Sequence, residues 1–345
     1  MFAVSCASLS HCFAASDRGN DMVLNKLVVG LLSGLAIALC AGAASAAQPE
    51  QAAYAADGVL TCLKCHDRGA IDATAILKTP HGVKGDSRTP FSQNGCESCH
   101  GASPAHYKTA TAEGQMRPAP AVVFKGPNAS PVAERNKMCL GCHESGLRMN
   151  WQGSQHHSND VACSNCHTIH VDKDPILVKA TQAVKCFTCH AQQRAESTQF
   201  SHHPIREGKV VCSDCHNPHG SPGPKLLKEF TVNETCFNCH QDKRGPFLWE
   251  HEPVRDDCTN CHTPHGSTQA RLLKERPPFL CTTCHEEGGH QAAVFSGNVT
   301  PGLNANLGTT LTQGAINLRM TARGCVNCHS EIHGSNSQSG AFFNR

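Results

Sequence analysis

The sequence is poor in the residues that usually build a protein core. Aromatic residues make up only 5% of the 345 positions, with 2 tryptophans and 2 tyrosines. After residue 46 the apolar runs are short, and glycine and proline interrupt them. The length alone would allow two or three ordinary domains, but side chains offer little apolar volume for their cores. We therefore expect the core to contain something other than side chains.

An excess of one charge is also missing. Lys and Arg number 30 against 28 Asp and Glu, which gives a formal net charge of +2. This balance favours neither nucleic acid nor a strongly acidic surface, and we expect no nucleic-acid partner. Beyond residue 46 no apolar run approaches the ~20 residues that a membrane-spanning helix needs. The chemistry of the chain must therefore be sought in its motifs.

Residues 1–46 have the features of a secretory signal. Lys26 precedes the apolar run LVVGLLSGLAIALC (27–40), and the small residues AGAASAAQPE that follow contain an A-x-A cleavage pattern. Met22 is the expected start, because the residues before it contain no apolar run. The shortness of the run disfavours an uncleaved anchor, and the leucine before Cys40 disfavours a lipid attached there. We expect export to the periplasm.

Free thiols are absent from the expected mature chain, because one motif, C-x-x-C-H, uses every cysteine after position 40. Ten copies contain twenty of the 23 cysteines. The cysteines are Cys62, Cys65, Cys96, Cys99, Cys139, Cys142, Cys163, Cys166, Cys186, Cys189, Cys212, Cys215, Cys236, Cys239, Cys258, Cys261, Cys281, Cys284, Cys325 and Cys328. The histidines that end the motifs are His66, His100, His143, His167, His190, His216, His240, His262, His285 and His329.

Three chemistries compete for such a repeat. A disulfide framework would suit an exported chain but gives no reason for a histidine after every second cysteine. Zinc sites use cysteine pairs two at a time and do not require a histidine at one fixed place. C-x-x-C-H is the attachment signature of c-type haem, in which both thiols form thioethers and the histidine is the proximal iron ligand. Ten copies in an exported chain favour ten covalently bound haem c groups.

The remaining histidines keep the same phase. One histidine, or one adjacent pair, lies after each motif and before the next. The candidate distal ligands are His81, His106, His156, His170, His202, His219, His251, His265, His290 and His333. In the two adjacent pairs, aligning the chain with itself places Glu252 opposite His203, so we expect His202 and, by the same logic, His156 to be the ligands. Ten motifs and ten distal candidates predict two histidines at every iron.

Several distal candidates follow a motif very closely. His219 lies only three residues after His216, as in CSDCHNPHG. Three residues cannot reach from one face of a porphyrin to the other, so the two histidines must serve different irons. The spacing predicts closely packed haems. Motif starts 47, 50 and 45 residues apart, from Cys139 to Cys281, define a repeating unit of two motifs.

The fold class that these patterns predict is a multihaem cytochrome c. We expect mostly coil with short α-helices around a linear chain of ten covalent haems, an elongated shape and little or no β-structure. Short helices are expected near AERNKMCLGCH (133–143) and QAVKCFTCHAQQRAEST (182–198). The domains predicted after the signal are an N-terminal pentahaem half, 47–195, and a C-terminal pentahaem half, 196–345.

Two histidines at each iron leave no position for a substrate. We therefore expect an electron-transfer protein without a catalytic residue, and not an enzyme. Ten adjacent haems exceed the need of a diffusing carrier, so the number favours electron transfer over distance.

The motif number and the segments CHNPHG, CHTPHG, CHGASPAHY and HEPVRDDCTNCHTPHG resemble the MtrA/DmsE family of decahaem cytochromes, which includes MtoA and PioA type proteins. The resemblance implies a periplasmic chain associated with the outer membrane through a β-barrel porin. It also implies partners among periplasmic or inner-membrane cytochromes, and outside the cell a multihaem cytochrome or iron and other metals. The function implied is electron relay for extracellular Fe(II) oxidation or metal reduction.

Two other functions compete with this conduit. A soluble periplasmic carrier could feed a terminal reductase of the dimethyl sulfoxide reductase type. A multihaem enzyme acting on nitrite or hydroxylamine would need an open iron site, which the pattern does not provide.

Overall fold

The computed structural model describes residues 53–67, 73–110, 112, 115–285, 324–338 and 340–344. All of them belong to one compact unit, Ala52–Arg345. The predicted secretory signal and the candidate ligand His290 lie outside the described residues.

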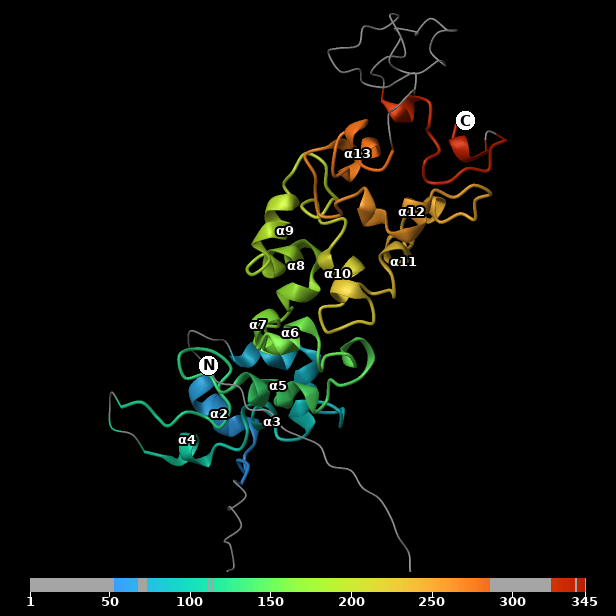
Figure 1. The fold of residues 1–345 in the computed structure, drawn as a ribbon. Helices are drawn as coiled ribbons and strands as arrows, with labels where there is room; N and C mark the ends of the chain where they lie inside the picture. Colours follow the sequence, from blue (N-terminus) through green and yellow to red (C-terminus); the bar gives the residue numbers. More distant parts are fainter. Residues whose placement is uncertain are drawn as a thin grey trace, which may run out of the picture. The chain divides into compact units, whose positions relative to one another are not determined.

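The described chain consists of short helices joined by coil, with no β-strand drawn in it (Figure 1). Its α-helices are α2 (Val59–His66), α3 (Glu97–His100), α4 (Pro104–Lys108), α5 (Val132–Leu140), α6 (Gln155–Ser158), α7 (Cys163–Cys166), α8 (Lys179–Cys186), α9 (Ala191–Glu196), α10 (Cys212–Cys215), α11 (Val232–Phe237), α12 (Glu252–Asp256) and α13 (Phe279–Thr282). Its 3₁₀ turns are η1 (Ala73–Lys78), η2 (Pro80–Gly82), η3 (Pro90–Ser92), η4 (Gly146–Arg148), η5 (Pro175–Leu177), η6 (Pro224–Leu226), η7 (Gln241–Lys243), η8 (Cys258–Asn260), η9 (Ala270–Leu272), η11 (Cys325–Asn327) and η12 (Gly340–Phe342). The predicted fold class of short helices and coil is confirmed.

The longest helix of the described part, α5, has nine residues and lies in the first segment where a helix is predicted. The second such segment is divided into α8 and α9 by the turn at 187–190. None of the helices in the described part is both long and apolar enough to pass through a bilayer. β-Pairing among the described residues is limited to isolated antiparallel bridges, such as that between His216 and Leu227.

Each motif forms one helical turn, which explains why the helices are so short. In the nine motifs from Cys96 to His329, the backbone N–H of the histidine donates to the carbonyl of the first cysteine at 2.9–3.1 Å. This is the i to i−4 bond of an α-helical turn. After the turn the chain leaves the helical path, as at His167 and His216, where the backbone is extended. The motif itself therefore builds the local structure.

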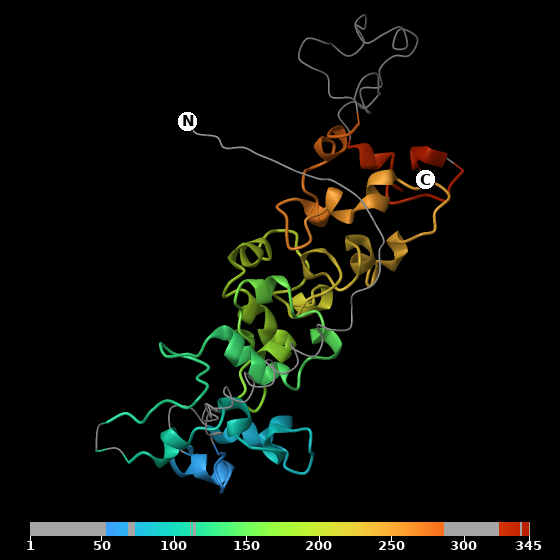
Figure 2. The same cartoon turned by 60° about the horizontal axis from the view of Figure 1, so that its bottom comes forward.

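The side-chain core of the described part is small. Nine hydrophobic residues are buried, namely Val59, Ala75, Ile76, Phe91, Val122, Trp151, Ala162, Ala183 and Val211. Large apolar side chains remain on the surface of the polypeptide, including Phe200, Phe230 and Leu248, which are 80%, 74% and 77% exposed. Short helices and coil are visible throughout the described chain from a second direction as well (Figure 2). The polypeptide alone lacks the apolar core that a chain of this size needs, in agreement with the scarcity of aromatic residues.

Candidate functional site

The histidines of the described chain lie in pairs, each of one motif histidine and one histidine from outside the motifs. The nine pairs are His66–His106, His81–His143, His100–His170, His156–His190, His167–His219, His203–His240, His216–His265, His251–His285 and His262–His333. Their ring centres are 5.9–6.3 Å apart. An iron–nitrogen bond of about 2 Å and about 1.1 Å from nitrogen to ring centre would place two imidazoles on one iron about 6.2 Å apart. The spacing therefore fits one iron between each pair.

The pairs connect successive repeat units. We number these units 1 to 5 (residues 62–106, 139–170, 186–219, 236–265 and 281–333), each with a first and a second motif. The first-motif histidine of a unit pairs with the distal histidine of the preceding unit, as His190 of unit 3 pairs with His156 of unit 2. The second-motif histidine pairs with the closely spaced distal histidine of the next unit, as His167 of unit 2 pairs with His219 of unit 3. Unit 1 closes on itself through His66 and His106. Each unit is thus tied to its neighbours.

The cysteines show that motifs consecutive in sequence are neighbours in space. Within each unit the first cysteine of the second motif lies close enough to raise the pKa of the first cysteine of the first motif: Cys96 acts on Cys62, Cys163 on Cys139, Cys212 on Cys186, Cys258 on Cys236 and Cys325 on Cys281. Between units, the second cysteines of adjacent motifs interact electrostatically: Cys99–Cys142, Cys166–Cys189, Cys215–Cys239 and Cys261–Cys284. These nine interactions link the ten motifs in sequence order.

In the folded polypeptide the neighbouring thiols shift the acidity of each other. The Cys139 thiol lowers the pKa of the Cys163 thiol to about 7, and the Cys186 thiol does the same for Cys212. The pKa values of Cys139 and Cys186 are raised in turn by these neighbours and by burial.

Hydrogen bonds fix the orientation of many of the paired imidazoles. The motif residues His100, His216 and His262 make a hydrogen bond through Nδ1 to a backbone carbonyl at 2.9–3.0 Å. His106, His156 and His203 do the same at 2.6–2.8 Å, in each case to a proline carbonyl. When Nδ1 donates, Nε2 is left as the free ligand atom, which is the usual arrangement of metal-bound histidines. The residues therefore fit a haem iron.

One predicted ligand differs from the structure. Aligning the chain with itself favours His202 as the ligand, but His203 is the residue that lies opposite His240. His202 has both ring nitrogens occupied, Nδ1 with the Gln199 carbonyl at 2.7 Å and Nε2 with Glu207 at 3.5 Å. His203 uses only Nδ1, toward the Pro264 carbonyl at 2.6 Å. The physical reason for the correction is this proline carbonyl, which selects the second histidine of the pair.

In the other adjacent pair, the first histidine is the one that lies opposite a motif histidine. His156 lies opposite His190, with its Nδ1 on the Pro218 carbonyl at 2.8 Å. His157 instead packs edge-on against Trp151, and its Nδ1 accepts from the Gly153 N–H at 3.2 Å. His157 therefore has a supporting role.

Two buried asparagines, which sequence reasoning missed, join the motifs of a unit. Asn136 accepts from the Cys163 N–H at 2.8 Å and donates to the Val161 carbonyl at 3.2 Å. Asn233 accepts from the Cys258 N–H at 2.7 Å and donates to two carbonyls at 2.9 Å. The helices involved are in contact, α5 with α7 and α11 with η8. The signal in the sequence is an asparagine three residues before the first cysteine of a unit, in NKMC and NETC.

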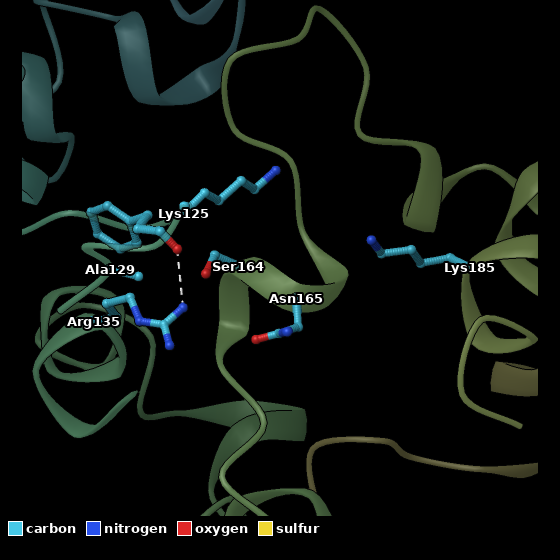
Figure 3. Close-up of a pocket in the computed structure, with 8 residues that line it drawn as sticks. Lys125, Ala129, Arg135, Ser164, Asn165 and Lys185 are labelled. Carbon is cyan, nitrogen blue, oxygen red and sulfur yellow. Dashed lines mark hydrogen bonds between the residues drawn. The ribbon is translucent and has the colours of Figure 1, made fainter. Parts of the chain in front are cut away.

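A cationic pocket of about 450 Å³ lies beside the second motif of unit 2. Lys125 and Lys185 extend into it from opposite sides of the Ser164–Asn165 turn (Figure 3). Arg135 lines the pocket but is engaged with the carbonyls of Ser130 and Phe124 at 2.8 and 3.0 Å. Lys125, Lys185 and Arg135 make the pocket cationic, which favours an anionic group there.

The geometry defines the class of protein. No group of three or more His, Cys, Asp or Glu residues in the described chain is arranged to hold a metal ion by itself, as a zinc site would require. Helical C-x-x-C-H turns with paired histidines instead define a multihaem cytochrome c, an electron-transfer protein with covalently bound haems.

Comparison with known proteins gives the family. The description "Doubled CXXCH motif" matches residues 202–245 and 251–290, and "Cytochrome c-type protein NrfB-like" matches residues 96–182. The chain is 39% identical over 292 residues to the multiheme cytochrome MtrA of Shewanella baltica, covering 85% of this chain and 83% of that protein. It is 29% identical over 160 residues to the cytochrome c-type protein NrfB of Haemophilus influenzae, covering 40% of this chain and 67% of that one. The chain belongs to the MtrA family of multihaem cytochromes.

Proposed function

We propose that ten irons are each held by two histidines in this chain. The nine observed pairs carry the proposal, because their spacing leaves room for one iron each. The motif histidine His329 and the candidate distal ligand His290 belong to none of the nine pairs. The pairing rule assigns these two to each other, which would close unit 5 on itself as His66 and His106 close unit 1.

The arrangement favours a conductor of electrons over an enzyme. Each bound haem supplies a one-electron ferric/ferrous couple. The polypeptide places consecutive motifs in contact and would occupy both axial positions, which leaves no position for a substrate. Electrons would therefore pass from neighbour to neighbour in sequence order, without chemistry on a small molecule.

The proposed setting is the outer membrane, with the chain entering a β-barrel porin from the periplasm. Family membership supports this setting, and a barrel with a polar lumen could accommodate a chain of this kind. The partners would be periplasmic or inner-membrane cytochromes on one side and a multihaem cytochrome, iron or another metal on the other. Extracellular Fe(II) oxidation and metal reduction are the two reactions such a conduit would serve.

The division into pentahaem halves, 47–195 and 196–345, stays a prediction. The border falls inside unit 3, between the motif that begins at Cys186 and the motif that begins at Cys212. The proposed border therefore divides one of the five two-motif units, unit 3, between its two motifs.

The conduit is tested with liposomes that enclose an electron acceptor. We expect no transfer when the purified cytochrome is added alone, and rapid transfer when the cytochrome and its β-barrel are inserted together. The barrel alone and the barrel with a small monohaem cytochrome are the controls. Transfer that never depends on the barrel, together with fast reduction of a periplasmic reductase, would replace the conduit with the soluble carrier.

A further inference from the structure

The second-motif histidine of unit 2 has a hydrogen-bond partner unlike those of its counterparts. In the other four units Nδ1 of this histidine bonds to a backbone carbonyl, namely His100 to Val122, His216 to Lys225, His262 to Arg271 and His329 to Phe342. Nδ1 of His167 instead faces a carboxylate oxygen, Oδ2 of Asp174, at 2.7 Å. One motif histidine in the set thus has a charged acceptor.

The difference arises at one place in the repeat. Asp174 lies seven residues after His167, where units 3 and 4 have Gly223 and Gln269. In those units the residues that offer the carbonyl, Lys225 and Arg271, have positive φ of 51° and 61°. Such a left-handed backbone is costly for residues with a side chain, and it turns the carbonyl toward the histidine. Unit 2 has no positive φ in η5 and uses the carboxylate instead.

The carboxylate is held firmly in place. Its second oxygen, Oδ1, accepts from the Thr168 N–H at 3.2 Å and from the Ile176 N–H at 3.4 Å, at the start of η5. The side chain of Asp174 is 11% exposed and that of His167 is 29% exposed. Capping of η5 would need only Oδ1, so the cap does not explain the bond from Oδ2 to His167. No lysine or arginine of the described chain forms an ion pair with Asp174, so its charge acts on the imidazole.

A charged acceptor on Nδ1 strengthens a histidine as a donor to its metal, because the imidazole gains anionic character. A stronger donor stabilises the ferric form, which carries one more positive charge than the ferrous form, and so lowers the potential. We propose that Asp174 is a positioning residue that lowers the reduction potential of the haem ligated by His167 and His219 below that of its neighbours. The inference rests on the proposed ligation by two histidines.

The position of this haem in the array determines how a lowered reduction potential would affect electron transfer. It is the fourth in sequence order, between the haems of His143 and His190. Reduction of its iron takes one electron from either neighbour and moves no proton. A lower potential at this place keeps the haem oxidised while its neighbours are reduced, so it limits how freely electrons pass through the array.

The test is the variant Asp174→Asn in the holoprotein. Both carboxylate oxygens of Asp174 accept hydrogen bonds, so the asparagine amide of the variant can take either of two orientations. In both orientations the charge that faces His167 is removed. At fixed potential we expect about a tenfold higher ratio of reduced to oxidised form for one haem in ten, which equals about 59 mV for one electron. The matched control is Asp172→Asn, which removes a charge that is 59% exposed and paired with Lys78 at 3.4 Å.

Spectroelectrochemical titration should show one tenth of the haem absorbance moving upward in Asp174→Asn, while Asp172→Asn follows the native curve. Identical titrations of Asp174→Asn and the native protein would overturn the proposal, as would equal shifts in both variants. If Asp174→Asn does not mature, near-infrared magnetic circular dichroism of the native ferric protein must show one haem in ten with a more anionic ligand. Carbon monoxide binding by the native protein would instead disprove the ligation itself.

Discussion

The adjacent residues His202 and His203 offer the sharpest test of the ligand assignment. The rings of His203 and His240 are 6.3 Å apart, whereas both ring nitrogens of His202 are engaged by Gln199 and Glu207. The variant His203→Ala should therefore leave one iron of ten without its sixth ligand. We expect a tenth of the haem to become high-spin and to bind carbon monoxide. The variant His202→Ala should leave all ten haems low-spin.

The assay is the carbon monoxide difference spectrum of the reduced protein, scaled to total haem by the pyridine haemochrome. Added imidazole should enter the space left in His203→Ala and restore the low-spin spectrum. His290→Ala should open another tenth of the haem, since His290 is the proposed partner of His329. A tenth opened by His202→Ala and none by His203→Ala would refute the reasoning from the Pro264 carbonyl.

Three other predictions follow from the described structure. Asn233→Ala leaves three backbone groups without their hydrogen-bond partner and should lower the stability of the holoprotein by about 1–3 kcal/mol. Asn159→Ala, at an exposed position, should change the stability by less than about 0.5 kcal/mol. Thermal unfolding followed by circular dichroism compares the two variants, and equal effects would contradict the role of Asn233 in joining the motifs of unit 4. The two imidazole planes are 10–21° apart in five of the histidine pairs and 53–73° apart in the other four. Electron paramagnetic resonance of the ferric protein should therefore show two families of low-spin signals. One uniform family would count against the pairing. Expression without the haem attachment machinery should give an unfolded chain by circular dichroism, because so few apolar side chains are buried; a cooperatively folded apoprotein would be inconsistent with that view.

The sequence allowed the motif chemistry to be predicted because covalent attachment imposes a fixed spacing. The turn at Cys212 to His216 needs two thiols and one imidazole on a single helical turn, so C-x-x-C-H can be recognised without a structure. The helices in 133–143 and 182–198 were located because each precedes or follows such a turn. The segment KLLKEF (225–230) is too short for its pattern to indicate a helix or a strand. In the structure Lys225 and Leu226 have a left-handed backbone, and the Lys225 carbonyl accepts a hydrogen bond from His216.

Which histidine lies opposite His240 could not be predicted from sequence, for a physical reason. Aligning His202 with His251 compares residue types, but the choice between His202 and His203 depends on a carbonyl 61 residues away, that of Pro264. Asp174 was missed for a related reason. A carboxylate in a polar loop has no distinctive pattern until the fold brings it to Nδ1 of His167.

The pairing between units has a consequence for how such arrays can change in length. An interior unit receives no ligand from itself and supplies one to each side, so its two irons are completed by different neighbours. Removing half of a unit would leave an iron with one histidine and a histidine with no iron. Duplicating a whole interior unit restores every partnership, because the copy offers the same pair of contacts as its parent. Duplication of a whole interior unit is therefore a change of length that leaves every iron with two histidines.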